Sequence, residues 1–175
     1  MDLDQLRYPV GKFASPSSIT AEQIALWIEE IKALPELLHR ELDNISATDL
    51  VKTYRPGGWN ITQLVHHLAD SHMTSFIRFK LSLTEEHPVI KPYLEDEWGK
   101  MADNKELNFI YSLNLLTALH YRWGYILDHM KPEQFINNGY FHPDKKRVVP
   151  LQEATALYAW HCRHHLAHIR NAKNS

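Results

Sequence analysis

The sequence predicts an all-α protein, a four-helix bundle with a short β-hairpin before its last helix. Four segments repeat apolar residues at the three- and four-residue spacing of amphipathic helices, with connections between them. Hydrophobic residues make up 44% of the chain and charged residues 23%, so we expect a packed core rather than disorder. A length of 175 residues fits one domain, and we expect a single domain over residues 1–175.

The first long helix is predicted to begin after Thr20, which can form a capping box with Gln23. Residues 1–18 come before it. They hold two prolines and a glycine and are expected to form an irregular lead-in. Pro35 lies inside the apolar pattern of this helix, so we expect it to kink or split the helix.

The second helix is predicted from Ile61 to Leu83, because Asn60 and Gln63 form another capping box at its start. Residues 84–104 contain two prolines and several charges and are expected to form a long connection. A connection of this length permits a topology other than simple up-and-down.

The third helix is predicted from Lys105 to His129, where Pro132 follows closely. The stretch GYFHPDKKRVVP, residues 139–150, reads as two short extended pieces around a Pro-Asp turn. The last helix is predicted to start near Leu151 and to run past His168.

Histidine is the unusual component of this sequence. The chain has twelve histidines, about three times the number expected for its size, and four lie in HCRHHLAH, residues 161–168. On a helical wheel, His161 and His165 fall in the middle of the apolar stripe of the last helix, one turn apart. Each buried imidazole needs a polar partner, and one metal ion would serve both, so this pair predicts a metal site.

A third ligand is expected from QLVHHLADSHM, residues 63–73, but periodicity leaves its identity open. His66 and His67 flank the apolar stripe on opposite sides, and His72 lies near its centre. Periodicity favours His72, or His67 if the stripe is widened, with His142 as an outside candidate. The remaining histidines have no histidine at helical pair spacing and are expected in surface or capping roles; they are His39, His87, His120 and His129.

Four stretches of the chain resemble the DinB/YfiT-like metal-dependent hydrolases, and within them the YfiT branch. These stretches are RYPVGKF, YRPGGWNITQLVHHLADSHMTSFIRFKLSLTEE, YFHPDKK and LYAWHCRHHLAHI. The resemblance implies a DinB/YfiT-like four-helix bundle, a homodimer, and one divalent metal ion, zinc or nickel, bound by His67, His161 and His165. Residues 101–114 match the family pattern only loosely, so specificity can differ there.

The expected site is catalytic rather than structural. Three imidazoles leave at least one coordination position open, and a water bound there would have its pKa lowered to about 7, which suits hydrolysis. The same position could hold the thiolate of a small thiol, and the YfiT branch includes S-transferases that use bacillithiol. The competing hypothesis is a non-catalytic helical scaffold, in which a fourth protein ligand such as His72, His142 or His168 closes the site.

Other features limit the partners. A formal net charge of −2 argues against nucleic acid, and no apolar run is long enough for a membrane span, so we expect a cytoplasmic protein acting on a small molecule. Asp70, Glu153 and Tyr158 are candidates for orienting the ligand histidines. Cys162 points away from His161 on the helix and is expected to pack rather than to react.

Overall fold

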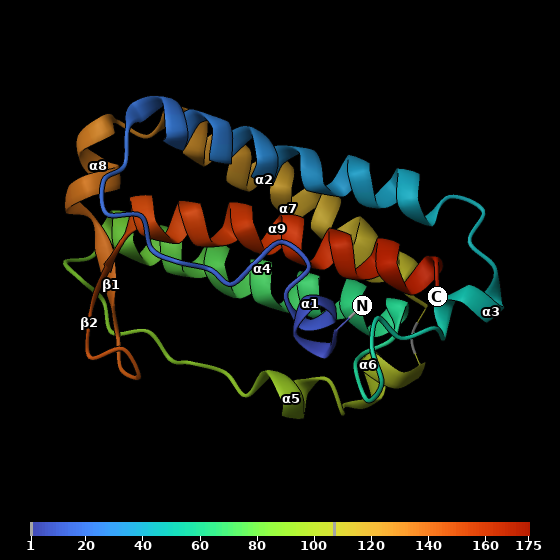
Figure 1. Ribbon diagram of the computed structural model, residues 1–175. Helices are drawn as coiled ribbons and strands as arrows, with labels where there is room; N and C mark the ends of the chain where they lie inside the picture. Colours follow the sequence, from blue (N-terminus) through green and yellow to red (C-terminus); the bar gives the residue numbers. More distant parts are fainter. Residues whose placement is uncertain (1, 107) are drawn as a thin grey trace.

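Four long helices form the body of the molecule in the computed structural model, which describes residues 2–106 and 108–175 (Figure 1). The long helices are α2 (Ala21–Leu42), α4 (Ile61–Thr84), α7 (Ile110–His129) and α9 (Leu151–Lys173). Short helices lie between and before them: α1 (Leu3–Arg7), α3 (Ala47–Leu50), α5 (Glu95–Trp98), α6 (Ala102–Glu106) and α8 (Pro132–Asn137). The predicted four-helix bundle is confirmed.

The long helices are not arranged in simple up-and-down order. Helices α2 and α4 each pack against both α7 and α9, so α2 and α4 lie at opposite corners of the bundle. After α4 the chain returns along the whole length of the bundle through α5 and α6 before α7 begins (Figure 1). Helices α4 and α7 therefore run in the same direction, and the predicted long connection is what makes this possible.

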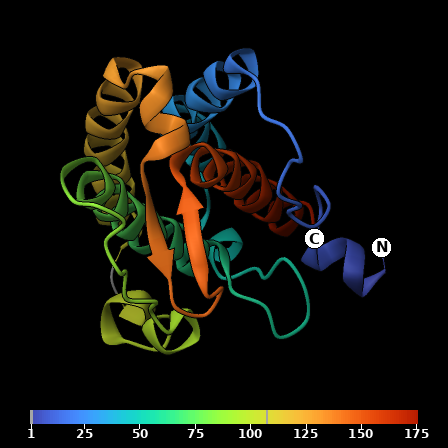
Figure 2. The same ribbon diagram turned by 90° about the vertical axis from the view of Figure 1, so that its left-hand side faces the viewer.

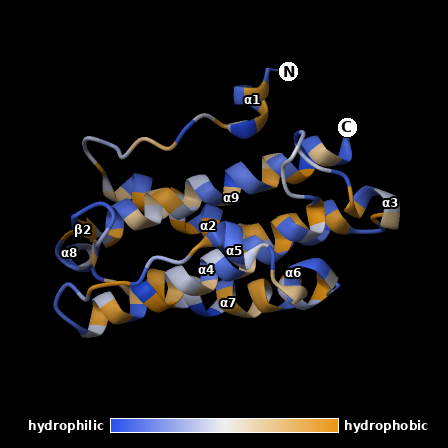
Figure 3. Cartoon of the chain, turned by 90° about the horizontal axis from the view of Figure 1, so that it is seen from below, coloured by the Kyte–Doolittle hydropathy of each residue, from blue (hydrophilic) through white to orange (hydrophobic). Residues whose placement is uncertain are grey.

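Each long helix turns an apolar face into the core, and hydrophilic and hydrophobic residues alternate along the helices (Figure 3). Trp123 of α7 and Phe79 of α4 are fully buried in the centre and meet edge to face, with ring centroids 5.3 Å apart. Among the described residues, no helix is long and apolar enough to cross a lipid bilayer.

The predicted hairpin is confirmed at the end of the bundle where α9 begins (Figure 2). Strand β1 (Gly139–His142) pairs antiparallel with β2 (Arg147–Pro150), with Tyr140 opposite Val149. Arg147 makes a two-pronged ion pair with Glu153 in the first turn of α9, at 2.6 and 2.8 Å. This contact ties the hairpin to the helix that carries four of the histidines.

Two helix boundaries differ from prediction. The lead-in is not entirely irregular, because Asp2 and Gln5 form a capping box that starts α1. The predicted third helix is two helices, with α6 ending at Glu106 and α7 beginning at Ile110. Asn108 marks the new start, since its side chain accepts a hydrogen bond from the Ile110 backbone NH at 2.9 Å.

Pro35 does not split its helix. Helix α2 continues through it from Ala21 to Leu42. Ile31 and Leu34 before the proline, and Leu38 after it, are all fully buried in the same core. Burial on both sides of Pro35 holds the two halves of α2 in register, although proline removes one intrahelical hydrogen bond.

The start of α4 can be tested through its cap. Asn60 Oδ1 accepts a hydrogen bond from the Gln63 backbone NH at 2.8 Å. We expect Asn60→Ala to lower the free energy of unfolding by about 1 kcal/mol, because an end-of-helix NH loses its partner. Urea denaturation measures the change. Asn114→Ala, at an exposed position inside α7, is the control and should not destabilise the protein; an equal loss in both variants would contradict the role of the cap.

Candidate metal centre

Three histidines from two helices converge beside the bundle core. His67 comes from α4, and His161 and His165 come from successive turns of α9. Their ligand nitrogens all lie within 4.8 Å of one another. His67 and His165 are buried and His161 is partly buried. The structure therefore brings together the three residues that the resemblance selects.

The spacing of these nitrogens fits a shared ion. Nε2 of His67 and Nε2 of His161 are 3.4 Å apart. Two nitrogens bound to one tetrahedral ion at about 2.0–2.1 Å lie about 3.3–3.4 Å from each other. An imidazole ligand must also be neutral. Burial lowers the pKa of His67 to about 4 and lowers the pKa values of His161 and His165 well below their usual range, so all three are neutral near pH 7.

His72, which periodicity favoured as the third ligand, lies behind the cluster rather than in it. It is fully buried, in keeping with its place at the centre of the stripe. Both of its ring nitrogens are engaged: Nε2 with His161 Nδ1 at 2.9 Å, and Nδ1 with His120 Nε2 at 2.8 Å. His72 therefore contacts a candidate ligand instead of acting as one.

The prediction of a surface or capping role for His120 is wrong. This residue of α7 is buried, and its Nδ1 lies 2.6 Å from the Ile31 carbonyl oxygen of α2. A search for histidine pairs within one helix missed it because its histidine partner is on another helix. Its place on the apolar repeat of α7, between Leu116 and Trp123, was the signal that could have found it.

A second histidine group lies next to the first. It consists of His164, His165 and His168, and it shares His165 with the first group. Both nitrogens of His168 already have polar neighbours: Nδ1 faces His165 Nδ1 at 3.4 Å, and Nε2 faces the Arg7 carbonyl oxygen at 3.2 Å. The first group is therefore the better metal site, and His168 contacts one of its members, His165.

A cavity of about 420 Å³ opens onto the histidine cluster. Its walls come from α4, α5 and α9, from the loop after α3, and from α1 with the lead-in. They include charges of both signs: Arg7, Arg55, Glu95 and Asp96. Nε of Arg55 is buried and has no hydrogen-bond partner among the described residues. Nδ1 of His164, which also lines the cavity, is likewise buried and unpartnered. The walls thus carry charged side chains, and two buried polar atoms of lining residues lack a hydrogen-bond partner within the described part of the chain.

Two of the three expected orienting residues, Glu153 and Tyr158, have other hydrogen-bond partners. Glu153 is occupied by Arg147. The Tyr158 hydroxyl donates to the Ser71 carbonyl oxygen at 3.1 Å, while the Tyr158 ring packs against His161 with centroids 5.6 Å apart. Asp70 is partly buried, which raises the pKa of its carboxyl group. His142 lies in β1 and does not line the cavity.

Cys162 is buried, and burial raises the pKa of its thiol. The thiol therefore stays protonated near neutral pH and lacks the thiolate that a nucleophile requires. This agrees with the predicted packing role.

The buried histidines predict how stability depends on pH. Burial lowers the pKa values of His67 and His120 from 6.5 to about 4 in the folded state. Between these values the unfolded chain binds protons that the folded chain excludes. The metal-free protein should therefore lose stability as the pH falls from 6.5 towards 4, by about 1.4 kcal/mol per pH unit for each such group.

Urea midpoints at about pH 7.5 and about pH 5.5 measure this loss. His129→Gln, a change at an exposed position of α7, should leave the pH dependence unchanged. A midpoint that is the same at both pH values would contradict the expectation.

Residues 21–169 match the family model of the DinB superfamily. A Bacillus subtilis protein named "Putative metal-dependent hydrolase YfiT" is 45% identical over 164 residues, which cover 94% of this chain and 92% of that protein. A Halalkalibacterium halodurans protein, also named as a putative metal-dependent hydrolase, is 45% identical over 166 residues, or 95% of each chain.

A solved structure agrees with these matches. The structure of YfiT from Bacillus subtilis superposes with a TM-score of 0.92 at 44% identity and covers 97% of each chain. That protein is described as "a probable metal-dependent hydrolase with an unusual four-helix bundle topology". In this chain, the parallel α4 and α7 depart from simple up-and-down order (Figure 1). On the family model, the identities and the shared fold, the chain belongs to the DinB superfamily, in its YfiT-like branch.

Proposed function

We propose that this protein is a metal-dependent hydrolase whose divalent ion, zinc or nickel, is held by His67, His161 and His165. The observation that carries the proposal is the convergence of three neutral imidazoles on one side of a polar cavity. The names of the relatives at 45% identity support the same reaction class. Trihistidine sites accept several ions, so both zinc and nickel are retained.

A divalent ion at this site would supply Lewis acidity and activate a water molecule for attack near neutral pH. The chain itself supplies the remaining functions. Its helices hold three donor nitrogens in a fixed arrangement, and burial keeps them neutral. The cavity walls offer the charged side chain of Arg55 to a substrate.

The histidine cluster is open on the side that faces the cavity, and this supports an enzyme rather than a scaffold. A closed structural site needs a fourth protein ligand. His72 and His168 use both ring nitrogens in other contacts, and His142 does not line the cavity. A substrate or water can therefore take the position that a scaffold would fill with a side chain.

The cavity also bears on the substrate. A volume of about 420 Å³ suits a small molecule, and the guanidinium groups of Arg7 and Arg55 favour one that carries an anionic group. The second candidate function is transfer of a low-molecular-weight thiol such as bacillithiol to an electrophile. Arg7 and Arg55 in the cavity wall favour it as well, since a thiol that carries carboxylates would pair with their charges. A homodimer remains a prediction from the family resemblance.

Elemental analysis of the purified protein tests the metal site. We expect about one zinc or nickel ion per chain, lost in His67→Ala and in His165→Ala, because two imidazoles hold a transition ion weakly. His129→Ala, at an exposed position, should keep the ion. Full metal occupancy in the His67→Ala variant would contradict the assignment of His67 as a ligand. A natural protein that takes up no metal would contradict the enzyme proposal and support the scaffold hypothesis.

The metal-loaded protein separates the two reactions. Ester and amide hydrolysis should proceed without added thiol if the protein is a hydrolase. Consumption of an electrophile only when a small thiol is present would identify the transferase instead. Arg55→Gln should weaken the use of anionic substrates and spare neutral ones, since it removes the charge but keeps polar atoms at the site.

A further inference from the structure

Pro35 leaves a buried carbonyl group without its usual partner. In a regular α-helix, the backbone NH of residue 35 would donate to the carbonyl oxygen of residue 31. Proline has no NH, so the Ile31 oxygen of α2 loses that hydrogen bond. Ile31 is fully buried, and a buried carbonyl oxygen needs a donor from somewhere else.

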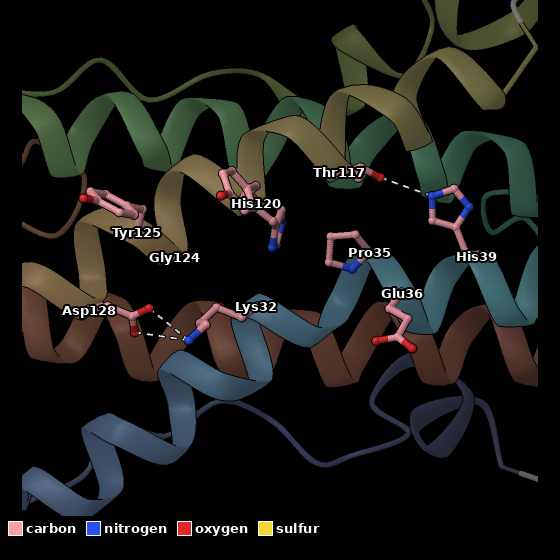
Figure 4. A pocket seen from close by; sticks show the side chains of 10 residues that line it. Lys32, Pro35, Glu36, His39, Thr117, His120, Gly124, Tyr125 and Asp128 are labelled. Atoms are coloured by element: carbon pink, nitrogen blue, oxygen red, sulfur yellow. Dashed lines mark hydrogen bonds and ion pairs between the residues drawn. The ribbon is translucent and has the colours of Figure 1, made fainter.

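His120 of the neighbouring helix α7 provides the donor. Pro35 and His120 line one cleft between α2 and α7 (Figure 4). His120 Nδ1 lies 2.6 Å from the Ile31 oxygen. A carbonyl oxygen only accepts, so Nδ1 must carry the hydrogen. The ring is neutral near pH 7, because burial lowers its pKa to about 4, and therefore Nε2 holds a lone pair.

The same argument applies to His72 and then to His161. His72 Nδ1 lies 2.8 Å from His120 Nε2, so it must donate to that lone pair. His72 Nε2 lies 2.9 Å from His161 Nδ1, and because the hydrogen of His72 is already on Nδ1, Nε2 is the acceptor and His161 Nδ1 is the donor. His161 therefore keeps its lone pair on Nε2. This is the atom that faces His67 Nε2 at 3.4 Å.

The direction of these hydrogen bonds cannot reverse. The reversed series would need a hydrogen on the Ile31 carbonyl oxygen, which has none to donate. Ring packing also holds the members in place: His72 meets the Tyr158 ring edge to face with centroids 5.2 Å apart, and His120 stacks with His72 at 4.9 Å. One carbonyl group thus decides which nitrogen carries the hydrogen in three successive imidazoles.

We propose that Pro35, His120 and His72 are positioning residues that fix the orientation and the tautomer of His161. Because Pro35 has no backbone NH, the Ile31 oxygen of α2 accepts a hydrogen bond from His120. The hydrogen bonds from His120 through His72 to His161 then leave the lone pair of His161 on Nε2, the atom that faces the metal site. This proposal rests on the metal site proposed above. It adds that part of the site's affinity is set by a proline on a helix that contributes no ligand.

Nitrogen NMR of the isotope-labelled, metal-free protein tests the tautomers directly at about pH 7.5, well above the lowered pKa values. We expect His72, His120 and His161 all to carry hydrogen on Nδ1. His168 is an internal reference of the opposite kind, because its Nε2 faces the Arg7 carbonyl oxygen at 3.2 Å. Hydrogen on Nε2 of any of the three would overturn the proposal, and no substitution is needed for this measurement.

Zinc affinity, measured by competition with a chelator, tests the positioning role. His120→Leu should weaken zinc binding about tenfold, as loss of an outer hydrogen-bond partner does at other sites. His120→Gln keeps one donor and one acceptor and should recover part of the loss. His39→Gln is the matched control, an exposed histidine beside the same cleft. Equal affinity in the natural protein and His120→Leu would overturn the proposal.

Pro35→Ala tests the origin of the chain. The substitution returns a backbone NH that competes with His120 for the Ile31 oxygen. We therefore expect the variant protein to bind zinc more weakly, although its helix α2 is more regular. Pro132→Ala is the control, because Pro132 is the first residue of α8, where a backbone NH has no intrahelical acceptor. Zinc affinity unchanged by Pro35→Ala would overturn the role of the proline.

The outcomes separate this proposal from the proposed function. A natural protein that binds no zinc overturns the metal site, and with it the positioning role, whatever the tautomers are. A natural protein that binds zinc but has hydrogen on Nε2 of His72 or His120 overturns the positioning role alone. Should His120→Leu fail to fold, the NMR experiment and the His120→Gln and Pro35→Ala variants still decide the question.

Discussion

The site depends on keeping imidazoles neutral between α4 and α9. Several histidines are buried here, and desolvation penalises their charged form, so each must end in a hydrogen bond or a shared ion. Buried polar groups of this number would destabilise the bundle if they lacked partners. Partners for the buried imidazoles come from three sources. These are neighbouring histidines brought together by helix packing, the backbone carbonyl groups of Ile31 and Arg7, and the candidate ion position.

The sequence predicted the features that repeat within one element. Capping boxes located the starts of α2 and α4, and the spacing of four residues singled out His161 and His165. Both signals depend only on helix geometry. The third histidine required the family resemblance, because His66 and His67 flank the stripe of α4 about equally. Which of them faces α9 depends on how α4 is rotated in the bundle, and a single helical wheel does not contain that rotation.

What the sequence did not predict lies between elements. His120 has its partners on α4 and α2, so no spacing within α7 shows them. Pro35 was expected to kink or split its helix because proline removes a hydrogen bond, whereas core burial on both sides keeps α2 continuous. Arg7 joins the cavity wall only because the lead-in folds back over α9, where the Trp160 indole NH donates to the Gly11 carbonyl oxygen at 3.0 Å.

That lead-in places part of the cavity wall outside the four-helix bundle. Arg7 and Tyr8 both line the cavity, although neither belongs to one of the four long helices. The shape and charge of this wall can therefore be altered by substitutions in a short segment that carries none of the three candidate ligands. Recognition and metal binding are thus carried by physically separate parts of the molecule.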